Sequence, residues 1–466
     1  MEKEKSAAKL LQEKICTTRK NGGLRLSADE IKTCFDYCED YKSFLDDAKT
    51  EREAVVKTVT MAEKCGFVEF KYGMSLKAGD KIYYNNRGKA VILAIIGSEP
   101  IENGVHLAAA HIDSPRLDLK QNPLYEDNET AFFKTHYYGG IKKYQWTAIP
   151  LALHGVVVKK DGTKVSVNIG EDESDPVFCI TDLLPHLAAD QMKRTPGELI
   201  KGEELNILVG SLPFKDDEVS DKVKLNIMSI LNEKYGMIEA DFLSAELEVV
   251  PAFKAKDVGL DRSMIGAYGH DDRVCSYPAL RALLDCADDT HTLMCVLADK
   301  EETGSIGVTG MQSQIFTDLM EEIALALGAN PRVVRGNSSC LSADVTAGFD
   351  PNFAEVYEKR NSAILGCGVA MSKYTGSRGK SGTSDANAEF VGKIRNMLDA
   401  NGVVWQSAEL GKVDEGGGGT VAAYIANRNI DTLDIGVPVI SMHAPIEVVS
   451  KVDVYAAYEA FLAFCK

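Results

Sequence analysis

Two stretches of the chain, 105–113 (VHLAAAHID) and 292–305 (TLMCVLADKEETGS), decide the fold that this sequence predicts. Each is an apolar run that ends in charged or metal-binding side chains, which is typical of a strand buried on both faces of a sheet. Strands of this kind form open parallel sheets, whose ligands bind at the carboxyl ends of the strands. We therefore predict an α/β fold with a mixed, mostly parallel sheet flanked by helices.

Helices are predicted at both ends of the chain. Ser27 with Glu30, and Thr50 with Glu53, form capping boxes, and each pair precedes apolar residues at helical spacing. We expect these two helices to open the fold and residues 454–466 (VYAAYEAFLAFCK) to close it as a third helix.

The pattern of apolar and polar residues changes between about Pro115 and Val250. Residues 154–170 (HGVVVKKDGTKVSVNIG) alternate around an Asp161-Gly162 turn, which is a hairpin signal, and acidic loops follow. We predict a body made of residues 1–115 and 250–466 that is interrupted by a β-rich insertion over residues 116–249.

Composition excludes several classes of protein. The 466 residues are 45% hydrophobic, which excludes disorder, and their net charge of −17 argues against a nucleic-acid binder. The longest apolar run, at 90–96, is far shorter than the roughly 20 residues of a membrane span. Residues 1–15 lack a secretory apolar region, and the eleven cysteines are scattered without a CxxC pattern. We therefore expect a cytoplasmic protein with reduced thiols and no membrane or nucleic-acid partner.

Residues that commonly bind metals follow apolar, strand-like runs at five places. One alone would be an ordinary helix cap or solvated loop, but five in one chain indicate a metal site. Imidazoles combined with carboxylates suit Zn²⁺, Mn²⁺ or Co²⁺ better than Ca²⁺ or Mg²⁺. The residues are His111 and Asp113, Asp271 and Asp272, Glu301 and Glu302, Asp344, and His443.

This set of residues suits hydrolysis. Two ions about 3.5–4 Å apart can share a bridging carboxylate and a water, lower the pKa of that water and polarise a carbonyl group. A carboxylate that binds no metal must then move the proton to the leaving group. Adjacent Glu301 and Glu302 allow one side chain to bind metal while the other faces the water. Asp113, two residues after His111, is placed to hold that imidazole in one tautomer.

The motifs HID, DDR, DKEETGS, SAD and SMHAPIE, in this order, resemble those of the aspartyl aminopeptidase family of dinuclear zinc peptidases. The resemblance extends to YYGG (137–140), LLPHLA (183–188) and DEGGGGT (414–420), and so covers nearly the whole chain. It implies an enzyme that removes the N-terminal residue, Asp or Glu, from peptides with two Zn²⁺ per subunit, for which Mn²⁺ or Co²⁺ can substitute. It also implies a homododecamer built from dimers, with the insertion as the oligomerisation domain.

The resemblance further assigns roles to individual residues. One metal would be held by His111, Asp271 and Asp344, and the other by Asp271, Glu302 and His443. Asp271 is preferred to Asp272 as the bridge because the family's ligand lies eight residues before the Ala-Leu pair that matches Ala279-Leu280. Glu301 would be the general base, His186 would reach a neighbouring subunit's active site, and Lys373 would lie near the acidic side chain of the substrate.

Departures from the family pattern keep alternatives open. Ala347 and Asp350 stand where the better-known members have two histidines, and IKKYQWTAIPL replaces a tryptophan-rich stretch. The alternatives are an aminopeptidase or dipeptidase for neutral residues, or a non-catalytic assembly or cargo protein of the same fold. The glycine run at 416–419 gives only a weak nucleotide-binding signal and equally suits close approach of backbone to substrate. His270, next to Asp271, is expected to be an exposed loop residue.

Overall fold

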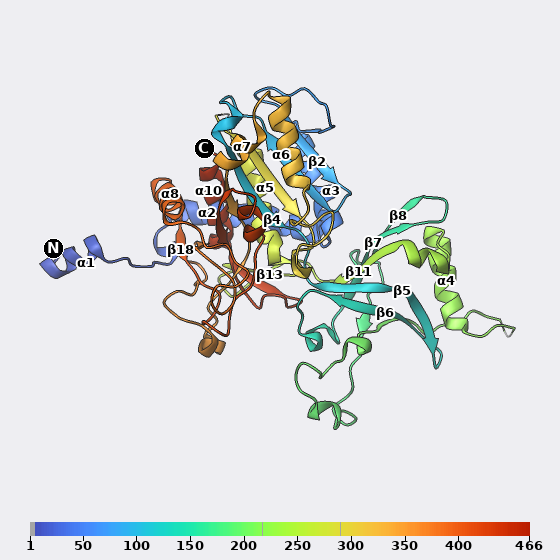
Figure 1. Ribbon diagram of the computed structural model, residues 1–466. Helices are drawn as coiled ribbons and strands as arrows, with labels where there is room; N and C mark the ends of the chain where they lie inside the picture. Colours follow the sequence, from blue (N-terminus) through green and yellow to red (C-terminus); the bar gives the residue numbers. More distant parts are fainter. Residues whose placement is uncertain (1–4, 217, 289) are drawn as a thin grey trace.

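Three β-sheets and their surrounding helices make up the computed structural model, which describes residues 5–216, 218–288 and 290–466. A body of sheet and helices bears a second, β-rich lobe that projects from one side (Figure 1). Helix α1 (Ala7–Ile15) stands away from the body, and none of its residues is buried. This helix precedes the two that the sequence predicted as the opening of the fold.

The body is built on a nine-stranded sheet with the order β1-β2-β3-β14-β4-β15-β19-β17-β18. Its four central strands, β14, β4, β15 and β19, run parallel, whereas the pairs β2–β3, β3–β14 and β17–β19 are antiparallel. The predicted mixed, mostly parallel sheet is confirmed. The strands are β1 (Val68–Glu69), β2 (Lys81–Asn86), β3 (Ala90–Ile95), β4 (Val105–His111), β14 (Thr292–Ala298), β15 (Ser339–Ser342), β17 (Val369–Ser372), β18 (Trp405–Ser407) and β19 (Asp431–Gly436).

Helices cover both faces of this sheet. One face packs against α2 (Ala28–Asp47), α3 (Glu51–Lys64), α5 (His270–Asp285), α8 (Ala388–Ala400) and α10 (Lys451–Phe464). The other face packs against α6 (Ile315–Ala326), α7 (Pro331–Asn337) and α9 (Ala422–Ala426). In β4, Leu107 and Ala109 join the second core and Ala110 joins the first, so this strand is buried on both faces as predicted.

The capping boxes form as the sequence predicts. The Ser27 hydroxyl accepts a hydrogen bond from the Glu30 N–H at 3.3 Å at the start of α2, and Thr50 does the same for Glu53 at the start of α3. Helix α10 closes the fold. Among the helices described, none is both long and apolar enough to cross a bilayer.

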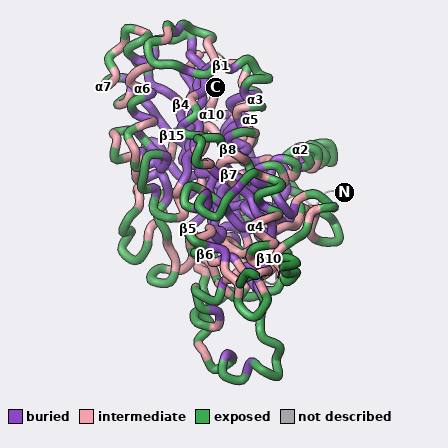
Figure 2. Tube along the Cα trace, turned by 90° about the vertical axis from the view of Figure 1, so that its right-hand side faces the viewer, coloured by how far each residue is buried: buried purple, intermediate pink, exposed green. Residues whose placement is uncertain are grey.

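The projecting lobe contains a seven-stranded sheet with its own core and helix α4 (Lys222–Tyr235). Its first and last strands along the chain pair with each other, with Leu117 opposite Val249, so the lobe leaves and rejoins the body through neighbouring strands. The predicted hairpin around Asp161 is the β7–β8 pair. The loop at the bottom of both views is mostly exposed, although parts of it are buried (Figure 2). The strands, in sheet order, are β8 (Lys164–Ile169), β7 (Leu151–Val158), β11 (Ala245–Pro251), β5 (Arg116–Asp127), β6 (Thr130–Tyr138), β10 (Ile207–Gly210) and β9 (Cys179–Ile180).

A third sheet of five strands lies beside the start of α5. Its order is β12 (Lys256–Val258), β13 (Met264–Ala267), β21 (Glu447–Ser450), β20 (Pro438–Ile440) and β16 (Thr346–Ala347). Residues 441–446 connect β20 to β21, and this connection brings His443 to the edge of the central sheet where β4 ends.

Candidate metal centre and substrate cavity

The carboxyl ends of the central parallel strands meet at one edge of the sheet, and the predicted ligands lie there. His111 ends β4 and is paired in register with Ala298, the last residue of β14. The chain then turns through a 3₁₀ helix at Glu301–Thr303, which places Glu301 and Glu302 at the same edge. Asp344 follows β15, and Asp271 lies in the first turn of α5.

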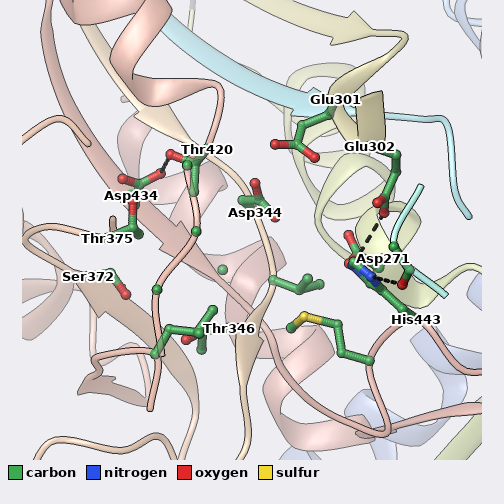
Figure 3. Close-up of a pocket in the computed structure, with 18 of the residues that line it drawn as sticks. Asp271, Glu301, Glu302, Asp344, Thr346, Ser372, Thr375, Thr420, Asp434 and His443 are labelled. Atoms are coloured by element: carbon green, nitrogen blue, oxygen red, sulfur yellow. Dashed lines mark hydrogen bonds and ion pairs between the residues drawn. The ribbon is translucent and has the colours of Figure 1, made fainter. Parts of the chain in front are cut away.

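Asp271 lies at the centre of the cluster. Its Oδ1 is 3.1 Å from His111 Nε2, and its Oδ2 is 3.1 Å from His443 Nε2. The ligand atoms of His111, Asp271 and Asp344 lie within 4.8 Å of one another, and so do those of Asp271, Glu302 and His443. Figure 3 shows Asp344 and His443 on either side of Asp271, with Glu302 directed at His443. The structure thus brings together all five predicted ligands.

The cluster has the properties of a metal site. His111 Nε2, Asp271 Oδ1 and Glu302 Oε1 are buried and face the cluster, and none of them makes a contact of hydrogen-bond geometry with the described residues, although His111 Nε2 and Asp271 Oδ1 lie 3.1 Å apart. Such atoms are costly to bury unless something binds them. A set of two imidazoles and several carboxylates fits zinc, which takes nitrogen and oxygen ligands. Asp272, by contrast, belongs to none of these groups, and its carboxylate accepts a hydrogen bond from the His111 N–H at 3.4 Å.

A buried carboxylate, Asp113, orients one side of the cluster. It accepts hydrogen bonds from the Glu301 and Glu302 N–H groups at 3.1 and 3.2 Å and from the Tyr138 hydroxyl at 2.8 Å. Its Oδ1 is also 3.3 Å from His111 Nδ1. Burial is the largest single influence and opposes ionisation, but His111, the Tyr138 hydroxyl and the charge of Arg116 together outweigh it and lower the pKa of Asp113. Asp113 therefore fixes both an imidazole and the glutamate pair.

A second carboxylate that orients the cluster was not predicted from the sequence. Glu447 is fully buried and accepts hydrogen bonds from the Asp271 N–H at 3.0 Å and from the His443 N–H at 2.7 Å. His443 Nδ1 donates to the Gly140 carbonyl at 2.8 Å, which leaves Nε2 for the cluster. Glu447 stands in the SMHAPIE motif four residues after His443, but only the fold brings it against Asp271.

The expectation for His270 was wrong. It is fully buried, and its Nε2 donates to the Ile265 carbonyl at 3.2 Å while Nδ1 lies 2.9 Å from the Tyr41 hydroxyl. The residue begins α5, whose first turn packs against α2, so its side chain points into the core and not into a loop.

A cavity of about 390 Å³ opens beside the cluster. The cluster forms one side, and Figure 3 shows Asp434, Thr420, Thr375 and Ser372 on the opposite side. Apolar side chains, including Val345, Leu410, Ile435 and Met442, complete the lining with the backbone of Gly417, Gly418 and Gly419. Glu301 also lines the cavity, and burial raises its pKa to about 7.

Two predicted residues lie apart from the cluster within this chain. His186 is exposed in a turn of the projecting lobe and does not line the cavity. The Lys373 ammonium forms an ion pair with Asp385, a carboxylate that Lys380 also contacts at 2.7 Å. Lys373 likewise does not line the cavity.

The fold and the cluster are those of a metal-dependent hydrolase. Residues 44–465 match the family model for "Aminopeptidase I zinc metalloprotease (M18)". The chain is 51% identical to a probable M18 family aminopeptidase 1 of Clostridium acetobutylicum, over 96% of this chain and 97% of that one. It is also similar to the crystal structure of an M18 aminopeptidase of Thermotoga maritima, with a TM-score of 0.92, 43% identity, and 97% and 99% of the two chains covered. The S. cerevisiae mApe1 dodecamer shares the fold at a TM-score of 0.76 and 22% identity, with 92% and 96% covered.

The chain belongs to the M18 family of zinc aminopeptidases, as its motifs predicted.

Proposed function

We propose that this M18 aminopeptidase hydrolyses the first peptide bond of its substrates at the cluster around Asp271. The observation that carries the proposal is the position of the Asp271 carboxylate, with one oxygen 3.1 Å from His111 and the other 3.1 Å from His443. A carboxylate that contacts two ligand groups in this way suits a site for two ions.

Two Zn²⁺ per subunit would be held by the residues assigned above, with Mn²⁺ or Co²⁺ able to substitute. His111, Asp271 and Asp344 would hold one ion, and Asp271, Glu302 and His443 would hold the other. When bound, the ions would supply Lewis acidity to the scissile carbonyl and lower the pKa of water.

Glu301 is the proposed general base. It lines the cavity, and its Oε2 is 3.9 Å from His111 Nε2. Its ligand atom also lies within 4.8 Å of those of His111 and Glu302, so geometry alone would allow Glu301 to bind a metal. We assign it the role of base because the family resemblance places it outside both proposed ligand sets. Glu301 would accept a proton from the attacking water and deliver it to the amine as the C–N bond breaks. Asp113 touches no substrate in this scheme. It positions Glu301 and Glu302 through their N–H groups.

We also propose that the insertion, over residues 116–249, assembles the enzyme into a homododecamer built from dimers. Leu183, Leu184, Leu187 and Met192, close to His186 in sequence, are each at least half exposed, and such a group of apolar side chains suits a protein interface. The related yeast mApe1 is a dodecamer. His186 would then complete a neighbouring subunit's active site.

The preferred substrate residue has two candidates. Asp or Glu follows from the family resemblance and requires Lys373 to leave Asp385. A neutral residue is favoured by the cavity itself, because no lysine or arginine is found among the described residues that line it. A panel of aminoacyl substrates, assayed on metal-stripped enzyme with Zn²⁺, Mn²⁺ or Co²⁺ restored, distinguishes these candidates. An enzyme that remains inactive on every substrate with each metal would instead indicate the non-catalytic alternative.

A further inference from the structure

An acidic side chain that belongs to none of the metal groups lies across the cavity from them. Asp434 is a buried residue of β19, where it is paired in register with Ser342 of β15 and Ser372 of β17. Figure 3 shows it at the side of the cavity opposite Asp271 and His443. The catalytic scheme above gives it no role.

Asp434 has a specific partner. Its Oδ1 accepts a hydrogen bond from the Thr420 hydroxyl at 2.9 Å. The Thr420 Oγ1 in turn accepts from the Ala422 N–H at 3.3 Å, at the start of α9. Thr420 is the first buried residue after residues 411–419, all of which are exposed or half-buried. The pair therefore joins the buried sheet to the end of this loop.

The loop before Thr420 lines part of the cavity with its backbone. We call residues 416–420 the glycine-rich wall. Gly417 has φ = 120°, and a Cβ there would lie 1.9 Å from the Gly376 carbonyl oxygen. The Gly376 N–H donates to the Gly418 carbonyl at 2.7 Å. The first four residues of the wall are glycines, which have no side chain to pack against a neighbour. The position of the wall therefore depends on these backbone contacts and on the Thr420 hydrogen bond.

We propose that Asp434 is a positioning residue that, through Thr420, holds the glycine-rich wall in place and so determines how tightly the substrate's first side chain is bound. This inference rests on the proposed function, because it assigns the cavity to that side chain. Asp434 touches neither substrate nor metal in this role. It acts on the shape of the cavity.

Two pairs of variants test the proposal in the metal-loaded, assembled enzyme. Thr420→Val removes the hydroxyl at nearly constant size, and Thr420→Ser keeps it. Asp434→Ala removes the acceptor, and Asp434→Asn keeps an acceptor oxygen. For a leucyl substrate, we expect Thr420→Val and Asp434→Ala to raise KM by about tenfold, as for the loss of one buried hydrogen bond, with kcat changed by less than about threefold. Thr420→Ser and Asp434→Asn should restore most of the substrate affinity.

Comparing substrates with and without a side chain distinguishes a role in positioning the wall from a general loss of structure. A glycyl substrate places no side chain in the cavity, so its KM should change by no more than about twofold in every variant. Equal effects on glycyl and leucyl substrates, or a Thr420→Val enzyme with unchanged KM for both, would overturn the proposal. Failure of the proposed function would give a different result. In that case the wild-type enzyme itself would hydrolyse no aminoacyl substrate.

Discussion

The two sides of the substrate cavity are built in opposite ways. On the side of the proposed metal ligands, side chains at the ends of buried strands converge, and buried Asp113 and Glu447 hold them through hydrogen bonds. On the opposite side, most of the glycine-rich wall is backbone, and a hydrogen bond from the Thr420 hydroxyl to Asp434 anchors it to the sheet. The first side depends on charge and the second on shape, so changes on the first should affect metal content and kcat, and changes on the second should affect KM.

The largest effect is expected on the ligand side, at Asp271. Asp271→Ala removes the carboxylate that contacts both histidines, so both ions should be lost and turnover should fall to background. Metal content per subunit, measured by mass spectrometry, checks this. Asp272→Asn is the matched control, because Asp272 belongs to no ligand group and should leave both ions bound. An Asp271→Ala enzyme that keeps two ions would assign the bridge to Asp272.

The next effect involves the projecting lobe, which places no side chain of its own chain among the ligands. His186→Ala should lower kcat by about 10²–10³-fold, as for the loss of one donor to a developing oxyanion, with metal content and assembly unchanged. Mixing these subunits with Glu301→Gln subunits should restore part of the activity, because some sites then combine an intact base with a neighbour's histidine. Light scattering checks the assembly. No recovery on mixing, or an active monomer, would refute the shared site.

A smaller effect is expected for Glu447, which binds no metal itself. Glu447→Gln keeps the size of the side chain but presents one acceptor oxygen to two N–H groups, so it should weaken metal affinity by about 10–100-fold. Titration with a competing chelator measures this affinity. Glu389→Gln, at an exposed position in the first turn of α8, serves as the control and should leave it unchanged. Equal affinities in all three proteins would show that Glu447 does not orient the metal ligands.

The smallest effect concerns stability on the side of the glycine-rich wall. Burial raises the pKa of Asp434 to about 7, so between about pH 4 and 7 the folded protein keeps a proton that the unfolded chain releases. The contribution of Asp434 to the free energy of unfolding therefore falls as the pH rises, and Asp434→Asn removes this pH dependence because asparagine does not ionise. The difference in Tm between Asp434→Asn and wild type should be more favourable to the variant at pH 8 than at pH 5, by a few degrees. A difference independent of pH would show that Asp434 ionises normally.

The same contrast explains what the sequence predicted and what it did not. The ligand side follows short motifs at the ends of apolar strands, so the sequence predicted the five side chains that the structure brings together, and the resemblance selected Asp271 over Asp272. Glu447 was missed because its partner, the Asp271 N–H, is 176 positions away. The glycine-rich wall gave only a composition signal, because its anchor pairs a loop with the middle of a strand. His270 was misplaced because neighbouring residues in the sequence do not reveal that Tyr41 packs against it.

The two adjacent glutamates have different roles in the proposed mechanism, with Glu301 as a base and Glu302 as a metal ligand. The most direct test is the kcat of Glu301→Gln at full metal occupancy, because glutamine keeps the size of the side chain but cannot accept the proton. We predict a fall in kcat of at least about 10²-fold with the number of bound ions unchanged. Wild-type turnover by the fully metal-loaded variant would show that Glu301 is not the base.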